Sequence, residues 1–229
     1  MLIGNTLKWV CSMAQAQCAK CGAKLCRTEK FETSVLPMFC PMRNEKELIR
    51  NAVARYDENC LKHLYLAATI GEKEAYEKVR GTTMAVRPRI REITELAKRM
   101  NVEKVGVAFC AGLSDEAKRA VEILEGHGLV IHSVCCKCGA IDKVKLGVPK
   151  EHKISDPNKF EAGCNPMVQA EVLNSAGTGF NVIIGLCVGH DMLFTIGSKA
   201  PVTTLIAKDR VAGHNPLATL YVGYHKRLI

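Results

Sequence analysis

The chain has 229 residues, a net charge of +9 and 12 cysteines, and 48% of its residues are hydrophobic. This is enough apolar material for one large domain, or for one domain with a small appendage, so folding does not require a disulfide framework. No signal peptide opens the chain and no run of about 18 apolar residues interrupts it, so we expect a cytoplasmic protein with reduced thiols and no membrane span.

The positive charge is spread along the chain. There are 13 Lys and Arg against 9 Asp and Glu up to Arg80, and 19 against 14 beyond it. Aromatic residues, on which nucleic-acid bases stack, make up only 5% of the chain. We therefore expect a solvated basic surface and no nucleic-acid partner. Nothing in the sequence indicates the oligomeric state.

The first hundred residues are predicted to hold no sheet. Residues 1–43 are rich in cysteine and show no regular period, so we assign them to a metal-binding segment. Residues 44–100 are predicted to form a helical region that packs on the core. Asn44 is expected to cap its first helix, with Glu47 three residues later, and Pro88 suits the first turn of another helix.

Strands alternate with helices from residue 101 onward. The four predicted strands are Lys104–Cys110, Leu129–Cys135, Asn181–Cys187 and Val202–Ala207. Helices are expected to start at Ser114, Asn165, His190 and Asn215. This alternation predicts a parallel sheet with right-handed crossovers. We therefore assign residues 101–229 to an α/β domain with a doubly wound, mostly parallel sheet of about four strands, flavodoxin-like or Rossmann-like.

The N-terminal cysteines have the spacing of a metal site. Cys18-x2-Cys21 is followed by a glycine, which suits a tight turn that presents both sulfurs to one ion. Cys26 and Cys40 would complete a four-thiolate site, with Cys11 as a reserve ligand. The spacing fits either zinc or an iron–sulfur cluster, and it does not decide between them.

A second set of cysteines is predicted to gather at one edge of the sheet. Its members are Cys110, Cys135, Cys136, Cys138, Cys164 and Cys187. Three of them end predicted strands, and parallel strands present their carboxyl ends at the ligand-binding edge. We expect Cys110, Cys135, Cys164 and Cys187 to form the cofactor-binding or redox site. A metal cluster, a zinc ion and a redox thiol set all remain open at this point, and so do the roles of Cys136 and Cys138.

The sequence Gly185-Leu-Cys187-Val-Gly189 matches a nucleophile elbow with cysteine in the serine position. A predicted strand precedes it and a predicted helix follows it, which is the required context. Cys187 is therefore a candidate catalytic nucleophile, with His190 or His214 as its base. The other interpretation is a glycine-flanked turn whose cysteine binds metal, and the surrounding thiols favour it slightly.

Several motifs together resemble a known family. They are CAKCGAKLC near the start, VGVAFCAGL at 105–113, CNPMVQAEVLN at 164–174, GLCVGHD at 185–191 and KDRVAGHNP at 208–216. They are similar to uncharacterised cysteine-rich metal-binding proteins of archaea and anaerobic bacteria, classed as a domain of unknown function. The resemblance covers nearly the whole chain and implies metal binding in a prokaryotic cytoplasm. It implies no reaction.

Three hypotheses of different kinds follow. The first is a metal-dependent redox or sulfur-handling protein, with a redox partner or a small-molecule substrate. The second is an enzyme that uses Cys187 as a covalent nucleophile. The third is a non-catalytic metal carrier or sensor. The sequence does not decide whether the chain is an enzyme.

Overall fold

The structure is a computed structural model that describes residues 16–29 and 32–229, so Cys11 lies outside the described residues. The chain divides into two compact units, one that runs up to Tyr65 and one that comprises Leu66–Ile229. The region expected to be helical, 44–100, is therefore shared between the two units.

The first unit consists of short helical turns and helices. Its elements are the 3-10 turns Cys18–Lys20, Leu25–Arg27, Thr33–Val35 and Arg55–Asp57, the helices α1 (Pro41–Asn44) and α2 (Lys46–Ala54), and the first part of α3 (Asn59–Glu74). The predicted N-cap at Asn44 is wrong, because Asn44 is the last residue of α1 and its side chain donates to the Met38 carbonyl at 2.6 Å. Pro41 starts a helix early, since its fixed φ suits the first turn, and Glu45 occupies the N-cap of α2.

The second unit contains a hairpin where only helices were expected. Strands β1 (Tyr76–Val79) and β2 (Thr82–Ala85) pair antiparallel across a two-residue turn. Both turn residues have positive φ, 50° at Arg80 and 83° at Gly81, which matches the twist of a tight hairpin. Helix α4 (Arg89–Arg99) follows, with Pro88 just before its first residue.

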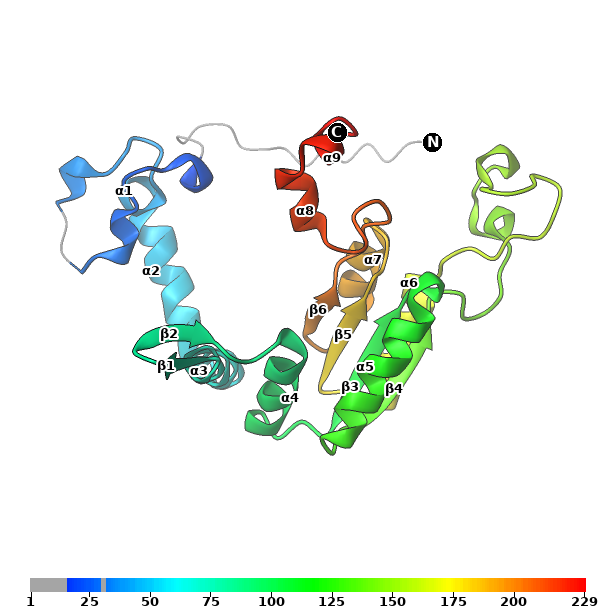
Figure 1. Cartoon of the computed structure of the whole chain (residues 1–229), viewed down its shortest axis with the longest axis horizontal. Helices are drawn as coiled ribbons and strands as arrows, with labels where there is room; N and C mark the ends of the chain where they lie inside the picture. The colour runs from blue at the N-terminus through cyan, green and yellow to red at the C-terminus, as the bar shows by residue number, and fades with distance from the viewer. Residues whose placement is uncertain (1–15, 30–31) are drawn as a thin grey trace. The chain divides into compact units, whose positions relative to one another are not determined.

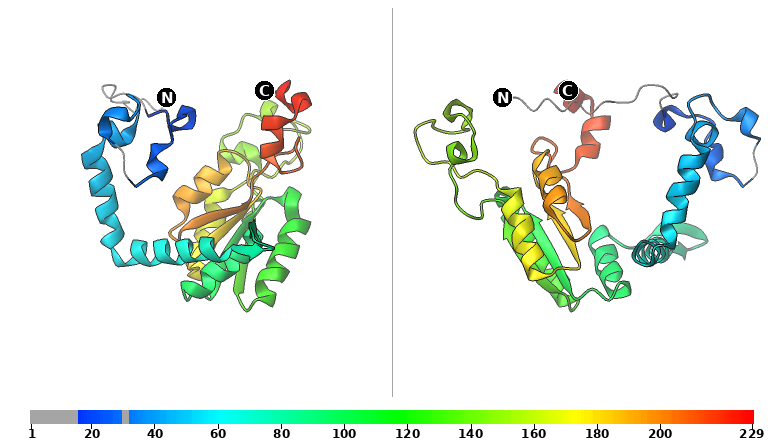
Figure 2. Two further views of the ribbon diagram at one scale, coloured as in Figure 1. Left: turned by 60° about the vertical axis from the view of Figure 1, so that its left-hand side comes forward. Right: turned by 180° about the vertical axis from the view of Figure 1, so that it is seen from behind.

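The sheet confirms the predicted α/β class. Strands β3 (Lys104–Phe109), β4 (Val130–Cys135), β5 (Phe180–Ile184) and β6 (Val202–Ile206) are all parallel and lie in the order β4-β3-β5-β6. Helices α5 (Ser114–Gly126), α6 (Pro166–Ala176) and α7 (His190–Gly197) connect them in turn. Figure 1 shows α5 in front of the sheet, and the rear view in Figure 2 shows α6 and α7 on the other face. The sheet is therefore covered on both faces.

The two layers of helices bury the central strands. All five residues of β5 are buried, and the core includes Leu124 of α5, Leu173 of α6 and Phe194 of α7, each fully buried. Such burial on both faces explains why the central strands read as continuous apolar runs.

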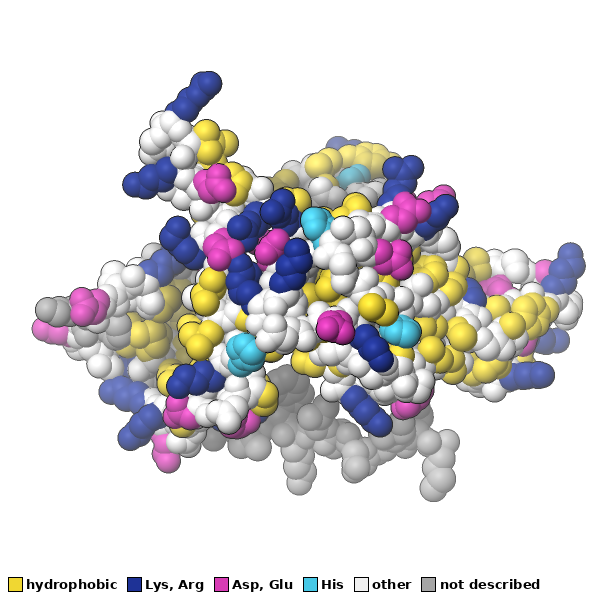
Figure 3. Space-filling view, turned by 90° about the horizontal axis from the view of Figure 1, so that it is seen from below, with side chains coloured by type: hydrophobic (Ala, Val, Ile, Leu, Met, Phe, Trp, Pro, Cys, Tyr) yellow, Lys and Arg dark blue, Asp and Glu magenta, His cyan; other side chains and the backbone are white. Residues whose placement is uncertain are grey.

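Short helices α8 (Pro216–Tyr221) and α9 (Gly223–Lys226) end the chain. In the part of the chain that the structure describes, no helix has both the length and the apolar character needed to cross a membrane. On the face drawn in Figure 3, basic side chains lie interspersed with acidic ones rather than in one patch.

Candidate functional site at the carboxyl edge of the sheet

The direction of the connections reverses beside the first strand of the sheet. From β3 the chain moves to β4 on one side, and it then crosses to β5 on the other side. Ligands of open parallel sheets bind outside the carboxyl ends of the strands at such a reversal. Cys110 follows β3 directly, and its backbone N–H donates to the Ile184 carbonyl at the end of β5 at 3.1 Å. Cys110 thus lies at this point of the sheet.

A long excursion separates β4 from α6, and its two ends are bound together. The Asn165 N–H donates to the Cys136 carbonyl at 2.7 Å, and the Gly163 N–H donates to the Ile141 carbonyl at 2.8 Å. The Lys137 ammonium adds a bond of 2.6 Å to the Ala162 carbonyl. We call these paired ends, residues 136–143 and 161–165, the neck. The neck brings the chain back to the sheet edge within a few ångströms of where it left.

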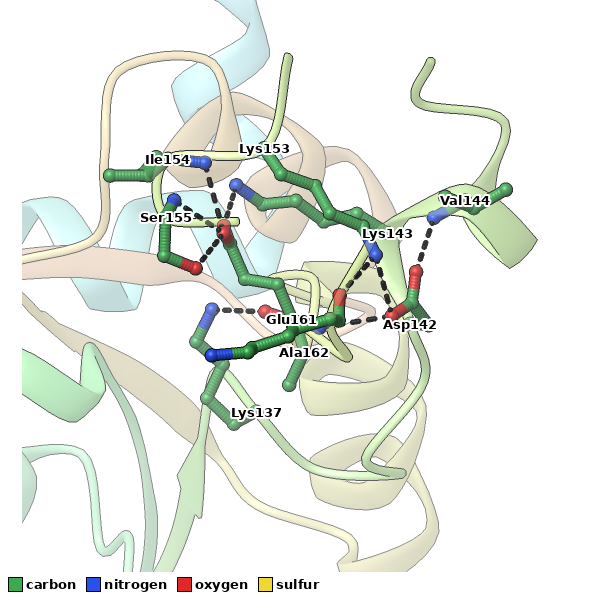
Figure 4. Close-up of polar contacts among 10 residues, drawn as sticks. Lys137, Asp142, Lys143, Val144, Lys153, Ile154, Ser155, Glu161 and Ala162 are labelled. Atoms are coloured by element: carbon green, nitrogen blue, oxygen red, sulfur yellow. Dashed lines mark hydrogen bonds and ion pairs between the residues drawn. The ribbon is translucent and has the colours of Figure 1, made fainter. Parts of the chain in front are cut away.

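Ion pairs and backbone bonds hold the excursion together (Figure 4). Asp142 accepts from the Glu161 N–H at 2.9 Å, the Val144 N–H at 2.9 Å and the Lys153 ammonium at 3.0 Å. Glu161 pairs with Lys143 and accepts from the backbone of the opposite turn. The backbone N–H of Val144, followed by that of Glu161, lowers the pKa of Asp142 to about 2, and the Lys143 contact lowers the pKa of Glu161 to about 2. Both carboxylates are therefore charged at neutral pH.

The neck places two cysteines beside each other, and a third lies beside them. Cys136 is the buried member, and the thiols of Cys164 and Cys110 lie close enough to it to shift its pKa. Its sulfur also accepts from the Ala111 N–H at 3.3 Å. We call Cys110, Cys136 and Cys164 the thiol cluster. Cys164 is half-buried and stands just before the first turn of α6, whereas Cys110 is buried.

The three thiols differ in their affinity for a proton. The hydrogen bond from Cys136 lowers the pKa of Cys164 to about 5, with a further contribution from the Lys137 charge. The same bond, together with burial, raises the pKa of Cys136 far above its ordinary value, so Cys136 keeps its proton. Burial is the largest single influence on Cys110 and opposes its ionisation, but the Lys208 ammonium, the Gly112 N–H and Cys136 together lower the pKa of that thiol. The cluster therefore combines a protonated centre with thiolate character at its flanks.

Each flanking cysteine has a cationic neighbour, and so does Cys187. The Lys208 ammonium lies 2.9 Å from the Cys110 sulfur. The Lys137 ammonium acts on Cys164 both by charge and by a side-chain contact. Nη2 of Arg210 lies 3.0 Å from the Cys187 sulfur.

Of the four cysteines predicted for this site, Cys110 and Cys164 each neighbour Cys136, a thiol whose role the sequence left open. The Cys135 sulfur accepts only a long bond, of 3.5 Å, from the Lys137 N–H. Cys187 contacts Arg210 instead. The doublet Cys135-Cys136 was the available signal, because adjacent residues at a strand end point in different directions.

Neither histidine proposed as the base for Cys187 is hydrogen-bonded to its sulfur among the described residues. Among the described residues, the hydrogen-bond partner of its sulfur is Arg210. His214 accepts from the Asp209 N–H at 3.2 Å, within its own loop. Nδ1 of His190 is buried without a partner among the described residues, and this histidine lies near enough to Cys164 to help lower the pKa of that thiol. The turn does have the expected glycine geometry, with φ of 63° at Gly185 and 87° at Gly189.

The four N-terminal cysteines of the predicted metal site line one pocket. Cys18, Cys21, Cys26 and Cys40 surround a space of about 230 Å³, together with Leu36 and its neighbours. The Cys21 N–H donates to the Cys18 carbonyl at 3.1 Å, which is the expected tight turn. Across the described ranges, however, no three His, Cys, Asp or Glu side chains lie close enough to hold a metal ion as they stand. The donor set fits a thiolate-bound metal, whereas the sulfur positions are more open than coordination requires.

The fold and this edge define a parallel α/β protein with a cysteine-rich site at the carboxyl ends of its strands. The chain belongs to the family described as "Protein of unknown function (DUF1847)", whose model matches residues 40–205. It is similar to the uncharacterized protein MJ0455 of Methanocaldococcus jannaschii, with 41% identity over 215 residues, which cover 93% of this chain and 98% of the relative. The resemblance to a domain of unknown function is thereby confirmed, and the comparisons carry no information on metal binding.

Proposed function

We propose that this chain is a thiol-based redox or sulfur-handling protein that works through the thiol cluster. The observation that carries this proposal is the placement of the buried Cys136 next to the neighbours of two other cysteines. Its sulfur accepts from the Ala111 N–H at 3.3 Å, one residue after Cys110. Its carbonyl accepts from the Asn165 N–H at 2.7 Å, one residue after Cys164. Idle cysteines at strand ends would pack as separate small apolar groups. Here one thiol that keeps its proton neighbours two thiols whose pKa is lowered, and both of these have cationic neighbours, which favour the thiolate.

The contact fits a dithiol that reduces a disulfide. The Cys164 thiolate, the more accessible flank, attacks one sulfur of a substrate disulfide, and the other half leaves as a thiolate. The Cys136 proton passes to that leaving thiolate. The Cys136 thiolate then attacks the Cys164 sulfur and releases the second half of the substrate. Two electrons have moved from the protein to the substrate, and a Cys136–Cys164 disulfide has formed.

Reaction of the reduced full chain with a neutral disulfide, bis(2-hydroxyethyl) disulfide, tests the proposal. We expect peptide mapping without reductant to identify a Cys136–Cys164 disulfide. Cys136→Ser should stop the reaction at a mixed disulfide on Cys164, because the second attack lacks its thiol. Cys60→Ser is the matched control, since Cys60 is exposed on α3 outside the cluster. A wild-type chain that forms no disulfide among the three cluster thiols would end the proposal.

We also propose that the N-terminal cysteines bind the metal ion or cluster that the sequence predicts. Four thiolates around one pocket are the donor set of structural zinc and of iron–sulfur centres. A bound metal would supply the cross-link that gathers Cys18, Cys21, Cys26 and Cys40, because folding and metal binding are coupled in such sites.

Metal analysis of anaerobically purified protein tests this second proposal. Cys21→Ser should lower the metal content by about one equivalent, as expected for a site that needs four thiolates. Cys60→Ser should leave the metal content unchanged. Equal metal content in wild type and Cys21→Ser would remove the assignment, and absorbance near 400 nm would identify an iron–sulfur cluster rather than zinc.

A further inference from the structure

We infer that the thiol cluster acts on small disulfides that carry negative charge, and that Lys208 and Arg210 recognise that charge. This inference rests on the proposed function and adds the class of substrate. Its basis is a set of cations at the sheet edge that contact thiols instead of carboxylates.

Three cations stand beside three cysteines from different elements. Lys208 and Arg210 lie 2.9 Å and 3.0 Å from the sulfurs of Cys110 and Cys187, and Lys137 lies beside Cys164. None of the three cations forms a salt bridge with any described Asp or Glu, although Lys143 and Lys153 of the same region do. Their positive charge is therefore not neutralised by a carboxylate.

The acidic residues of the two adjoining loops are engaged with their own backbone. Oδ1 of Asp209 accepts from Val211 N–H at 3.0 Å and Ala212 N–H at 2.9 Å, and Oδ2 accepts from a threonine hydroxyl. Oδ1 of Asp191 accepts from Gly189 N–H at 2.9 Å and Met192 N–H at 2.8 Å. Neither carboxylate contacts Lys208 or Arg210, so the positive charge of these two side chains is retained at the edge of the sheet. We call Lys208 and Arg210 the rim.

One loop carries both cations, and its shape is set internally. The His214 N–H donates to the Asp209 carbonyl at 2.7 Å, and the imidazole accepts from the Asp209 N–H at 3.2 Å. Gly213 and His214 both have positive φ, 57° and 62°, which closes the loop tightly. Lys208 and Arg210 thus extend from a preformed turn. Arg210 is exposed, so it remains accessible to a ligand from solvent.

Compact anions with a disulfide match this rim. A carboxylate near each sulfur would pair with Lys208 or Arg210 while the disulfide meets Cys164. Such pairing would add charge-assisted bonds beside the contacts that these cations make with Cys110 and Cys187. The electron transfer is the one described above, with two electrons passing from Cys136 and Cys164 to the substrate disulfide.

Three disulfides of similar size and different charge test this inference. They are 3,3'-dithiodipropionate, with two carboxylates, bis(2-hydroxyethyl) disulfide, which is neutral, and cystamine, with two ammonium groups. We expect the reduced full chain to react at low ionic strength about 10-fold or more faster with the anion than with the cation, as electrostatic steering allows. Added salt should lower this ratio of anionic to cationic rate toward one, because it screens the charges.

Substitutions at Lys208 and Arg210 test whether these two residues cause the preference for anionic disulfides. Lys208→Gln and Arg210→Gln should each lower the ratio of anionic to neutral rate by about 3-fold or more, since each removes one charge from the path of the substrate. Lys199→Gln is the matched control, because this exposed lysine precedes β6 at the opposite edge of the sheet and should leave the ratio unchanged. Equal rates for anion and cation would overturn the inference while leaving the proposed function intact. No reaction with any of the three disulfides would instead overturn the proposed function.

Discussion

The buried amide of Asn181 in β5 lies over the bare backbone of Gly106 in β3, and this pair gives a double-mutant test. A Cβ added at Gly106 of β3 would lie 1.9 Å from Oδ1 of Asn181. Asn181 is fully buried, and its amide is held at both ends, by the Thr178 hydroxyl at 2.8 Å and the Ser198 hydroxyl at 2.8 Å. The amide has no room to swing aside, so we expect Gly106→Ala to cost about 3 kcal/mol of unfolding free energy, at the upper end for overpacking.

The partner substitution removes the obstacle and also removes two bonds. Asn181→Ala leaves two hydroxyls short of a partner and opens a cavity, which together cost about 3 kcal/mol. The double variant places the new methyl of residue 106 in the vacated space. Its total cost should therefore be about 4 kcal/mol, roughly 2 kcal/mol less than the sum of the single costs, a coupling typical of residues in contact.

Urea unfolding followed by circular dichroism measures all four free energies. Gly126→Ala is the matched control, because a Cβ there meets nothing within 4 Å and the residue ends α5. That substitution should be neutral or stabilise by up to about 1 kcal/mol. If the two sites were additive to within about 0.5 kcal/mol, the amide would not be the obstacle and the reasoning would fail.

Three further predictions concern the site and its support. The alkylation rate of Cys164 should rise through pH 5, where its thiol ionises, and Lys137→Gln should move that profile to higher pH, as measured by mass spectrometry. The carboxyl of Glu161 should titrate at about pH 2 by NMR, and Lys143→Met should raise its pKa. Because the pKa is lowered from 4.5 in the folded chain, the stability that Glu161 contributes is present above pH 4.5 and is lost as the pH falls toward 2. Gln169→Met should lower the unfolding free energy by about 1 to 2 kcal/mol in urea, because its buried amide donates to carbonyls at the ends of β3 and β4.

The sheet could be predicted because its two central strands, β3 and β5, are buried on both faces. Residues 104–110 and 181–187 form apolar runs between helical segments, and each contains a strand of the structure within a few residues of the expected bounds. Parallel order then follows, since strands that alternate with helices need crossover connections. The strands end slightly earlier than predicted at β5, where Gly185 turns the chain with a φ of 63°.

The hairpin of β1 and β2 escaped prediction for the opposite reason. All eight of its residues are exposed, so no apolar alternation marks either strand. Only the turn at Arg80-Gly81 gave a signal, and glycine there also suits a break between helices. The N-cap at Asn44 was predicted wrongly because the sequence offers two possible helix starts. The proline three residues earlier, Pro41, is the one at which the helix begins.

The sequence predicted that the site lies at the carboxyl ends of the strands, but it did not predict which cysteines neighbour each other there. Parallel strands end together, so the general position of Cys110 followed from the fold class. The partnership of Cys136 with Cys164 depends instead on the neck, which joins backbone groups across an excursion that has no regular period. Periodicity carries no information on where such a loop returns.

The thiol cluster therefore has two independent supports. The sheet holds Cys110 and Cys136 through backbone bonds from Cys110 to β5 and from Cys136 to β3, of 3.1 Å and 2.9 Å. The neck joins Cys164 to them through its bond of 2.7 Å from Asn165 to Cys136, and α6, which follows Cys164, is fixed to the ends of β3 and β4 by the Gln169 amide. Cys164 thus precedes a helix on one face of the sheet, whereas Cys110 and Cys136 follow strands. This asymmetry suits a dithiol exchange, because the attacking thiol must reach the substrate while the resolving thiol stays behind it.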